Sequence, residues 1–221
     1  MMIDWTQIDT VLLDMDGTLL DLHFDNYFWL TYLPARYAAL NNLPIEAAEA
    51  RLHQEIKHHE GTLAWYCLDF WSERLGIDIV ALKHEVKDRI ALRPQAMEFL
   101  QLLGELGKER VLITNAHRGS LNLKLQETSL AFGVDRVISS HDYQAPKEDL
   151  KFWQALEDDL KFLPARTLFI DDTARILAKA AEYGIGHVLG IHQPDSKISR
   201  QMTEYPAIWD FAEIMPSTSN L

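Results

Sequence analysis

The chain has 221 residues, of which 48% are hydrophobic and 24% charged, so it is long enough for one substantial core or a core with a smaller insert. Acidic residues outnumber basic ones by 33 to 21, giving a net charge of −12 with neutral histidines. This charge argues against nucleic acid and anionic membranes as partners, because both are polyanions. Cys67 is the only cysteine, which excludes an internal disulfide and a cysteine-rich zinc site.

We expect no targeting segment at the beginning of the chain. Residues 1–10 have neither a basic region nor the apolar run of a signal peptide. No stretch approaches the roughly 18 consecutive apolar residues that suggest a membrane span. We therefore expect a cytoplasmic protein.

The first apolar run, residues 10–14, predicts a buried strand that ends in acids. Period-two geometry would place Asp14 and Asp16 on the same side of an extended chain, about 7 Å apart. Gly17 permits a turn directly after them. An Asp-Gly pair alone commonly marks only a turn, so a chemical role needs support from elsewhere in the sequence.

Residues 20–92 predict helices and no comparable strand. In residues 45–59, apolar side chains recur at the spacing of one helix face. Residues 63–76 are rich in aromatic side chains, namely Trp65, Tyr66, Phe70 and Trp71. We expect an all-helical insert here, and call residues 20–92 the cap. Its aromatics are interpreted as the core of a small helical domain, with stacking on a purine as the alternative.

After the cap, apolar runs alternate with helical patterns. Strands are predicted at residues 110–114, 136–140, 167–171 and 187–191. Helices are predicted at residues 94–107, 146–160 and 173–184. This alternation is typical of an α/β fold with a doubly wound parallel sheet, formed by residues 1–19 and 93–221. The last six residues are expected to be loosely held.

Polar side chains follow several of these strands. Thr114 and Asn115 lie at the end of the second strand, and Asp171 and Asp172 at the end of the fourth. Lys147 is expected to open the helix after the third. Ligands of open α/β sheets bind at the carboxyl ends of the strands, so these residues should meet Asp14 and Asp16 at one edge.

These residue types point to phosphoryl transfer. The carboxylates of Asp14, Asp16 and Asp172 suit Mg²⁺, which prefers oxygen ligands and retains positions for substrate phosphate oxygens. The lysine, the threonine hydroxyl and the backbone N–H groups near Gly17 would hold a phosphoryl group. A carboxylate can attack phosphorus, so we expect Asp14 to be the nucleophile. Asp16 would protonate the leaving oxygen and later deprotonate water.

Four motifs resemble a known family. "DMDGTLL", "LITN", "PKED" and "FIDD" occur in the order found in the haloacid dehalogenase superfamily of phosphohydrolases. The resemblance implies a Rossmann-like core with a helical cap inserted after the first motif. It also implies an aspartyl-phosphate at Asp14 and acid–base catalysis by Asp16. Phosphoryl oxygens would be bound by Thr114, Asn115 and Lys147, and Mg²⁺ by the Asp14 side chain, the Asp16 carbonyl and Asp172, with Asp171 assisting.

Stretches of the cap resemble a narrower group. "LLDMDGTLLDLHFDNYFW" and "WYCLDFWSERLGIDI" are similar to bacterial purine 5′-nucleotidases, which hydrolyse GMP and IMP to nucleoside and phosphate. This resemblance extends through nearly the whole chain and implies a purine nucleoside monophosphate as substrate.

Three other functions remain open from the sequence. A sugar phosphate phosphatase or phosphomutase of the same superfamily would keep both aspartates. A dehalogenase needs no acid to protonate a halide, so Asp16 and the magnesium-type carboxylates favour phosphorus. A non-catalytic binding protein would be free to lose the four motifs, yet this chain retains Asp14, Asp16, Lys147 and Asp172.

Overall fold

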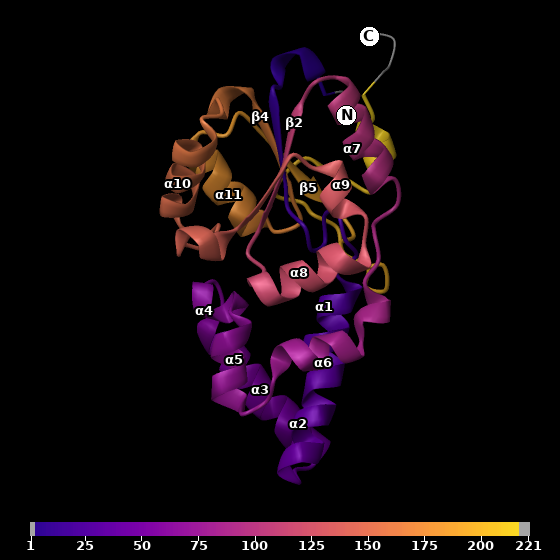
Figure 1. Cartoon of the computed structure of the whole chain (residues 1–221), viewed down its shortest axis with the longest axis vertical. Helices are drawn as coiled ribbons and strands as arrows, with labels where there is room; N and C mark the ends of the chain where they lie inside the picture. The colour runs from indigo at the N-terminus through magenta and orange to yellow at the C-terminus, as the bar shows by residue number, and fades with distance from the viewer. Residues whose placement is uncertain (1–2, 217–221) are drawn as a thin grey trace.

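Six strands form one parallel sheet in the part of the chain that the computed structural model describes, residues 3–216 (Figure 1). Their order is β3-β2-β1-β4-β5-β6, so the chain builds outward on one side of β1 and then on the other. The strands are β1 (Thr10–Leu13), β2 (Glu109–Thr114), β3 (Arg136–Ser139), β4 (Thr167–Asp171), β5 (His187–Ile191) and β6 (Ala207–Ile208). The predicted α/β, Rossmann-like fold is confirmed. The sequence did not predict β6, and most of the expected loose tail lies outside the described residues.

Helices cover both faces of this sheet. Alternation along β1 directs Val11 and Leu13 to one apolar cluster and Leu12 to the other. The first cluster includes residues of α7 (Ala96–Glu105), α8 (Arg118–Glu127) and α9 (Leu130–Gly133). The second includes residues of α10 (Leu150–Leu160) and α11 (Ala174–Tyr183). Full burial of one such Leu or Phe side chain contributes about 1.5–3 kcal/mol, so both layers stabilise the sheet.

Helices α7, α10 and α11 begin and end inside their predicted ranges, whereas α8 and α9 were not predicted. Helix α10 begins at Leu150, since the Asp149 carboxylate accepts a hydrogen bond from the Lys151 N–H at 2.9 Å. Lys147 therefore lies in the loop before the helix, which corrects the expectation that it opens the helix. Helix α11 ends where Gly184 adopts a positive φ of 111°.

The cap is helical and has an apolar cluster of its own. Its helices are α1 (His23–Tyr27), α2 (Leu33–Asn41), α3 (Ile45–His59), α4 (Leu63–Tyr66), α5 (Leu68–Leu75) and α6 (Ile79–Glu85), with a π-helical turn at Phe28–Tyr32. Leu52 and Trp71 are buried at its centre. The two connections to the sheet run side by side, because Leu20 forms an antiparallel bridge with Leu92. Figure 1 shows these helices beyond one end of the sheet, with α8 between the sheet and α6.

Short 3-10 helices complete the described structure. They are Trp5–Gln7, Lys87–Arg89, Ser140–Tyr143, Pro164–Arg166 and Phe211–Ile214. Between residues 3 and 216, none of the helices combines the length and the apolar character that crossing a membrane requires.

Candidate active site

Three buried carboxylates meet at the carboxyl ends of β1 and β4. Asp14 follows β1, Asp171 ends β4, and Asp172 comes directly after it. The Asp14 N–H donates to the Ile170 carbonyl at 3.0 Å. This bond continues the parallel pairing of β1 with β4 and places Asp14 beside Asp171. One oxygen from each carboxylate lies within 4.8 Å of the other two. The sequence prediction that strand ends deliver acids to one edge therefore agrees with the geometry.

Ionising all three buried carboxylates is unfavourable, because they lie close together and away from water. Burial and acidic neighbours together, against the opposing effect of Lys147, raise the pKa of Asp14, Asp171 and Asp172 to about 6 each. Lys147 and Arg200, which lies 3.4 Å from Asp172 Oδ2, supply only two positive charges against three carboxylates. An oxygen-only donor set with unbalanced negative charge fits a hard divalent cation such as Mg²⁺.

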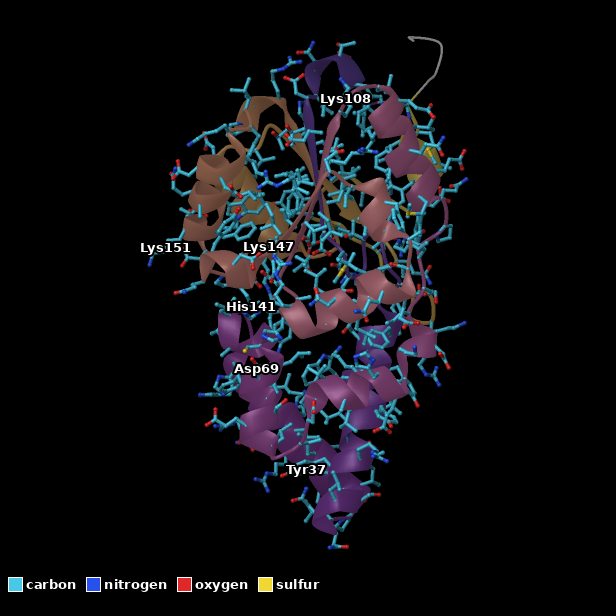
Figure 2. The ribbon with its side chains drawn as sticks, in the orientation of Figure 1. Tyr37, Asp69, Lys108, His141, Lys147 and Lys151 are labelled. Atoms are coloured by element: carbon cyan, nitrogen blue, oxygen red, sulfur yellow. The ribbon has the colours of Figure 1, made fainter. Side chains whose placement is uncertain are left out.

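Lys147 pairs with both Asp14 and Asp171. It comes from the loop after β3, which lies on the other side of β1 from β4. Its Nζ lies 2.5 Å from Asp14 Oδ1 and 2.7 Å from Asp171 Oδ2. Figure 2 shows Lys147 at the end of the sheet that faces the cap. Its backbone is held on both sides, because its N–H donates to Asn115 Oδ1 and its carbonyl accepts from Trp153 Nε1, each at 2.9 Å.

Thr114 and Asn115 have different surroundings although they are adjacent. The Thr114 hydroxyl accepts from the Ala116 N–H at 3.0 Å and lines the cavity, so its own O–H can donate to a ligand. The Asn115 amide donates to Glu148 Oε2 at 2.9 Å, while its oxygen accepts from Lys147. Asn115 thus anchors the loop that carries the lysine, and its contact with phosphate stays a prediction.

Gly17 allows the loop after β1 to pass close to the acids. Its φ is +90°, in the region that favours glycine. A Cβ at this position would lie 2.8 Å from Asp172 Cγ and 2.9 Å from Pro194 Cβ. The predicted turn is therefore also a point of close packing against an acid of the site.

Asp16 has a different environment from the one its spacing suggested. Among the described residues 3–216, the group of close carboxylates consists of Asp14, Asp171 and Asp172 and does not include Asp16. The Asp16 carboxylate instead pairs with Lys124 Nζ at 2.7 Å. Strand β1 ends at Leu13, and the chain then turns, with the N–H groups of Leu19 and Leu20 donating to the Met15 carbonyl. Period-two placement consequently does not apply to the pair, and the Asp16 carbonyl as a metal ligand stays a prediction.

A cavity of about 390 Å³ joins these residues to the cap. Apolar and aromatic side chains line its cap side: Trp29, Leu30, Ile56, Trp65, Leu68 and Trp71. Of the aromatics singled out in the sequence, Trp65, Tyr66 and Trp71 line the cavity, whereas Phe70 packs against Trp71 with ring centroids 5.1 Å apart. Trp71 also belongs to the apolar cluster of the cap, which agrees with the interpretation of these aromatics as the core of a small helical domain. Stacking on a purine stays a prediction.

Sequence reasoning missed several charged residues at this site. Lys124 and Lys83 are buried and pair with Asp25, and Arg200 donates to the Asp172 carbonyl oxygen. Both lysines lie on helices, where lysine normally extends to solvent. No local pattern marks them as buried. Tyr66, which donates to Glu148 Oε1 at 2.7 Å, was noted only as an aromatic.

Residues 8–184 match the haloacid dehalogenase-like hydrolase family. The GMP/IMP nucleotidase YrfG of Escherichia coli (strain K12) is 44% identical over 216 residues, which cover 97% of this chain and 97% of the relative. A protein of the same name from Shigella flexneri has the same identity and coverage.

Solved structures show the same fold at low sequence identity. A phosphatase from Thermococcus onnurineus superposes with a TM-score of 0.76 at 20% identity, covering 93% of this chain and 95% of that one. The L-2-haloacid dehalogenase of Xanthobacter autotrophicus superposes with a TM-score of 0.61 at 19% identity, covering 86% and 80%. Since the fold is shared by a phosphatase and a dehalogenase, the fold alone does not decide the reaction.

Proposed function

This chain belongs to the haloacid dehalogenase-like hydrolase family, and on that premise we propose that it is a Mg²⁺-dependent phosphomonoesterase that hydrolyses purine 5′-monophosphates such as GMP and IMP. The observation that carries the proposal is the buried group of Asp14, Asp171 and Asp172 with Lys147 between them. The 44% identity to a GMP/IMP nucleotidase supports the substrate.

In the first chemical step, Asp14 is the nucleophile. One of its carboxylate oxygens bonds to phosphorus while the bond from phosphorus to the 5′ oxygen breaks. Asp16 gives its proton to the departing oxygen, so the nucleoside leaves as a neutral alcohol. Burial, together with the neighbouring Asp25 and Asp14, raises the pKa of Asp16 to about 7, which keeps a proton available near neutral pH.

In the second step, water replaces Asp14 on phosphorus. Asp16 accepts a proton from the attacking water, the bond between Asp14 and phosphorus breaks, and inorganic phosphate leaves. Lys147 and Thr114 hold the phosphoryl oxygens in both steps. Asn115 keeps the Lys147 loop in place through the hydrogen bond at 2.9 Å.

The metal would be held by the Asp14 and Asp172 side chains and the Asp16 carbonyl, with Asp171 nearby. When bound, Mg²⁺ supplies positive charge that offsets the charge of the phosphate and of the acids. The crowding of three buried carboxylates within 4.8 Å supports this assignment.

The cavity and the composition support the remaining proposals. Apolar side chains such as Trp65 would contact the base, and a cavity of about 390 Å³ is within the range of small-molecule sites. The acidic net charge of −12 argues against nucleic acid or a membrane surface as partner, and the single cysteine suits the cytoplasm. A sugar phosphate phosphatase or phosphomutase is the second candidate, because the catalytic residues alone would serve either.

A substrate panel tests the function directly. Phosphate release from GMP, IMP, AMP and several hexose phosphates should be fastest with the 6-oxopurine nucleotides. Preference for a hexose phosphate would exclude the purine assignment, and isomerised sugar phosphate in place of free phosphate would identify a mutase. Asp14→Asn should lose turnover and remain folded, whereas Asp158→Asn, an exposed surface acid, should behave as wild type.

Metal removal tests the proposed cation. Chelation should abolish hydrolysis, and added Mg²⁺ should restore it. Mg²⁺ should also raise the melting temperature, because a ligand at 100 times its Kd stabilises the folded state by about 2.7 kcal/mol. Asp172→Asn should lose this thermal shift. Full activity in excess chelator would contradict the metal site.

A further inference from the structure

Four charged groups form a continuous chain from Asp16 into the cap, in which the two lysines are buried and the two acids are half-buried. Lys124 Nζ lies 2.7 Å from Asp16 Oδ1 and 2.6 Å from Asp25 Oδ2. The other oxygen of Asp25 lies 2.6 Å from Lys83 Nζ. The order is acid, lysine, acid, lysine, so the charges alternate, and they sum to zero when Asp16 has given up its proton.

The chain of charges crosses from the core to the cap. Lys124 comes from α8 of the core, whereas Asp25 and Lys83 come from α1 and α6 of the cap. The Lys83 ammonium also lies over the rings of Phe24 and Phe28, 4.7 and 4.6 Å from their centroids. Each lysine is only 1% exposed. The position of Lys124 is therefore determined by both parts of the molecule.

Stability alone does not account for this arrangement. Desolvation of buried ions opposes their attraction, and well-packed apolar residues usually stabilise a protein as well or better. Burial would raise the pKa of the Asp25 carboxyl, but Lys124 and Lys83 outweigh this effect and lower it, so Asp25 is a fixed anion between two cations. A fixed anion orients the lysine beside it.

We propose that Lys124 is a positioning residue that holds the Asp16 carboxylate where it meets the leaving oxygen and the attacking water, and that Asp25 and Lys83 keep Lys124 in place from the cap. The inference rests on the proposed function and deepens it. Correct placement of the proton-transfer group would then require a docked cap, which is also the part of the molecule that lines the cavity around the substrate.

The test uses a charge-balanced variant. Lys124→Met combined with Asp25→Asn removes one cation and one anion, which leaves Asp16 and Lys83 with no net change in charge. Lys124→Arg retains the cation. Lys87→Met is the matched control, because Lys87 pairs with Glu127 of the same α8 at 2.8 Å but on the surface and without contact to Asp16. Folding is checked by circular dichroism and thermal unfolding.

The expected result separates proton transfer from binding. With GMP, kcat of the double variant should fall by about 10²-fold or more, the usual contribution of general acid–base catalysis, while KM changes little. In a single turnover with p-nitrophenyl phosphate, release of nitrophenolate should stay near the wild-type rate, because this leaving group needs no proton. Lys124→Arg should recover most of the lost rate, and Lys87→Met should match the wild type.

Several outcomes would overturn the inference. A raised KM at unchanged kcat would make Lys124 a substrate-binding residue. Equal losses in nitrophenolate release and GMP turnover would indicate general damage, and an equal loss in Lys87→Met would indicate cap docking alone. Wild-type kcat in the double variant would remove the role of Lys124, whereas a wild-type protein inactive on every phosphate ester would instead overturn the proposed function.

A second variant keeps the test decisive if the first does not fold. Lys83→Met combined with Asp25→Asn removes both cap partners and leaves the pair of Asp16 and Lys124. It should lower kcat for GMP partially and spare nitrophenolate release. Wild-type kcat in this variant would exclude the anchoring role of the cap.

Discussion

At the scale of single residues, the site depends on Gly17 having no side chain. Gly17 and Gly61 have similar backbone angles, with φ of +90° and +80°. A Cβ on Gly61 would meet nothing within 4 Å, whereas a Cβ on Gly17 would press on Asp172 and Pro194. The two glycines therefore separate the cost of the backbone conformation from the cost of close packing.

Gly17→Ala is expected to reduce both stability and activity. Holding alanine in a left-handed conformation costs about 1–2 kcal/mol, and overpacking adds about 1–3 kcal/mol. Displacement of Asp172 should also lower kcat. Gly61→Ala should show only the smaller loss of stability. Thermal unfolding and steady-state kinetics measure both, and equal effects of the two substitutions would contradict the packing argument.

At the scale of elements, helix α10 fixes the loop that carries Lys147. Trp153 is fully buried against Phe169, with ring centroids 5.0 Å apart. Its Nε1–H donates to the Lys147 carbonyl at 2.9 Å. The packing of one helix on the sheet is thereby connected to the position of Lys147, six residues earlier in the chain.

Trp153→Phe should disturb Lys147 as well as the packing. The substitution leaves the buried Lys147 carbonyl without its donor, which costs about 1–3 kcal/mol. We expect a lower melting temperature and a lower kcat. Phe152→Leu is the control, because Phe152 is buried in the same helix turn but its ring has no hydrogen-bond donor for the Lys147 carbonyl. It should lower stability and leave kcat near the wild-type value; a similar kcat loss would refute the specific connection.

At the scale of the whole molecule, separate apolar clusters support the core and the cap. Two clusters lie on the faces of the sheet, and the third lies among the cap helices. Two features join the core and the cap. They are the paired connections near Leu20 and Leu92 and the chain of charges through Lys124. Because the apolar clusters are distinct, we expect local opening of the cap without unfolding of the sheet.

Leu52→Ala tests this independence. Leu52 is buried in the cap cluster, and its truncation should cost about 2–5 kcal/mol. Hydrogen exchange should accelerate in α2, α3 and α5 while the strands stay protected. Leu156→Ala, in the core cluster of α10, should instead accelerate exchange in the sheet. Uniform acceleration by either variant would mean that core and cap unfold together.

The sequence by itself determined the fold and the central acids. Strands of four to six residues with continuous apolar character, alternating with helical periods, predict a parallel sheet because both signals are local. Parallel strands end at one edge, so residues at these ends were expected to meet, and the carboxylates of Asp14, Asp171 and Asp172 do lie within 4.8 Å of one another, whereas that of Asp16 is not in this group. The two-residue strand β6 escaped prediction because it is too short to show a period.

Only the tertiary structure decided how the remaining charges are arranged. Lys124 meets Asp16 across 108 positions of sequence and Asp25 across 99. A lysine on a helix has the same local pattern whether its ammonium reaches solvent or a buried acid, so such contacts leave no periodic signal. Likewise, the turn after β1 directs Asp16 to Lys124 and leaves Asp171 beside Asp14, because chain packing, and not residue spacing, sets the direction of a side chain once a strand has ended.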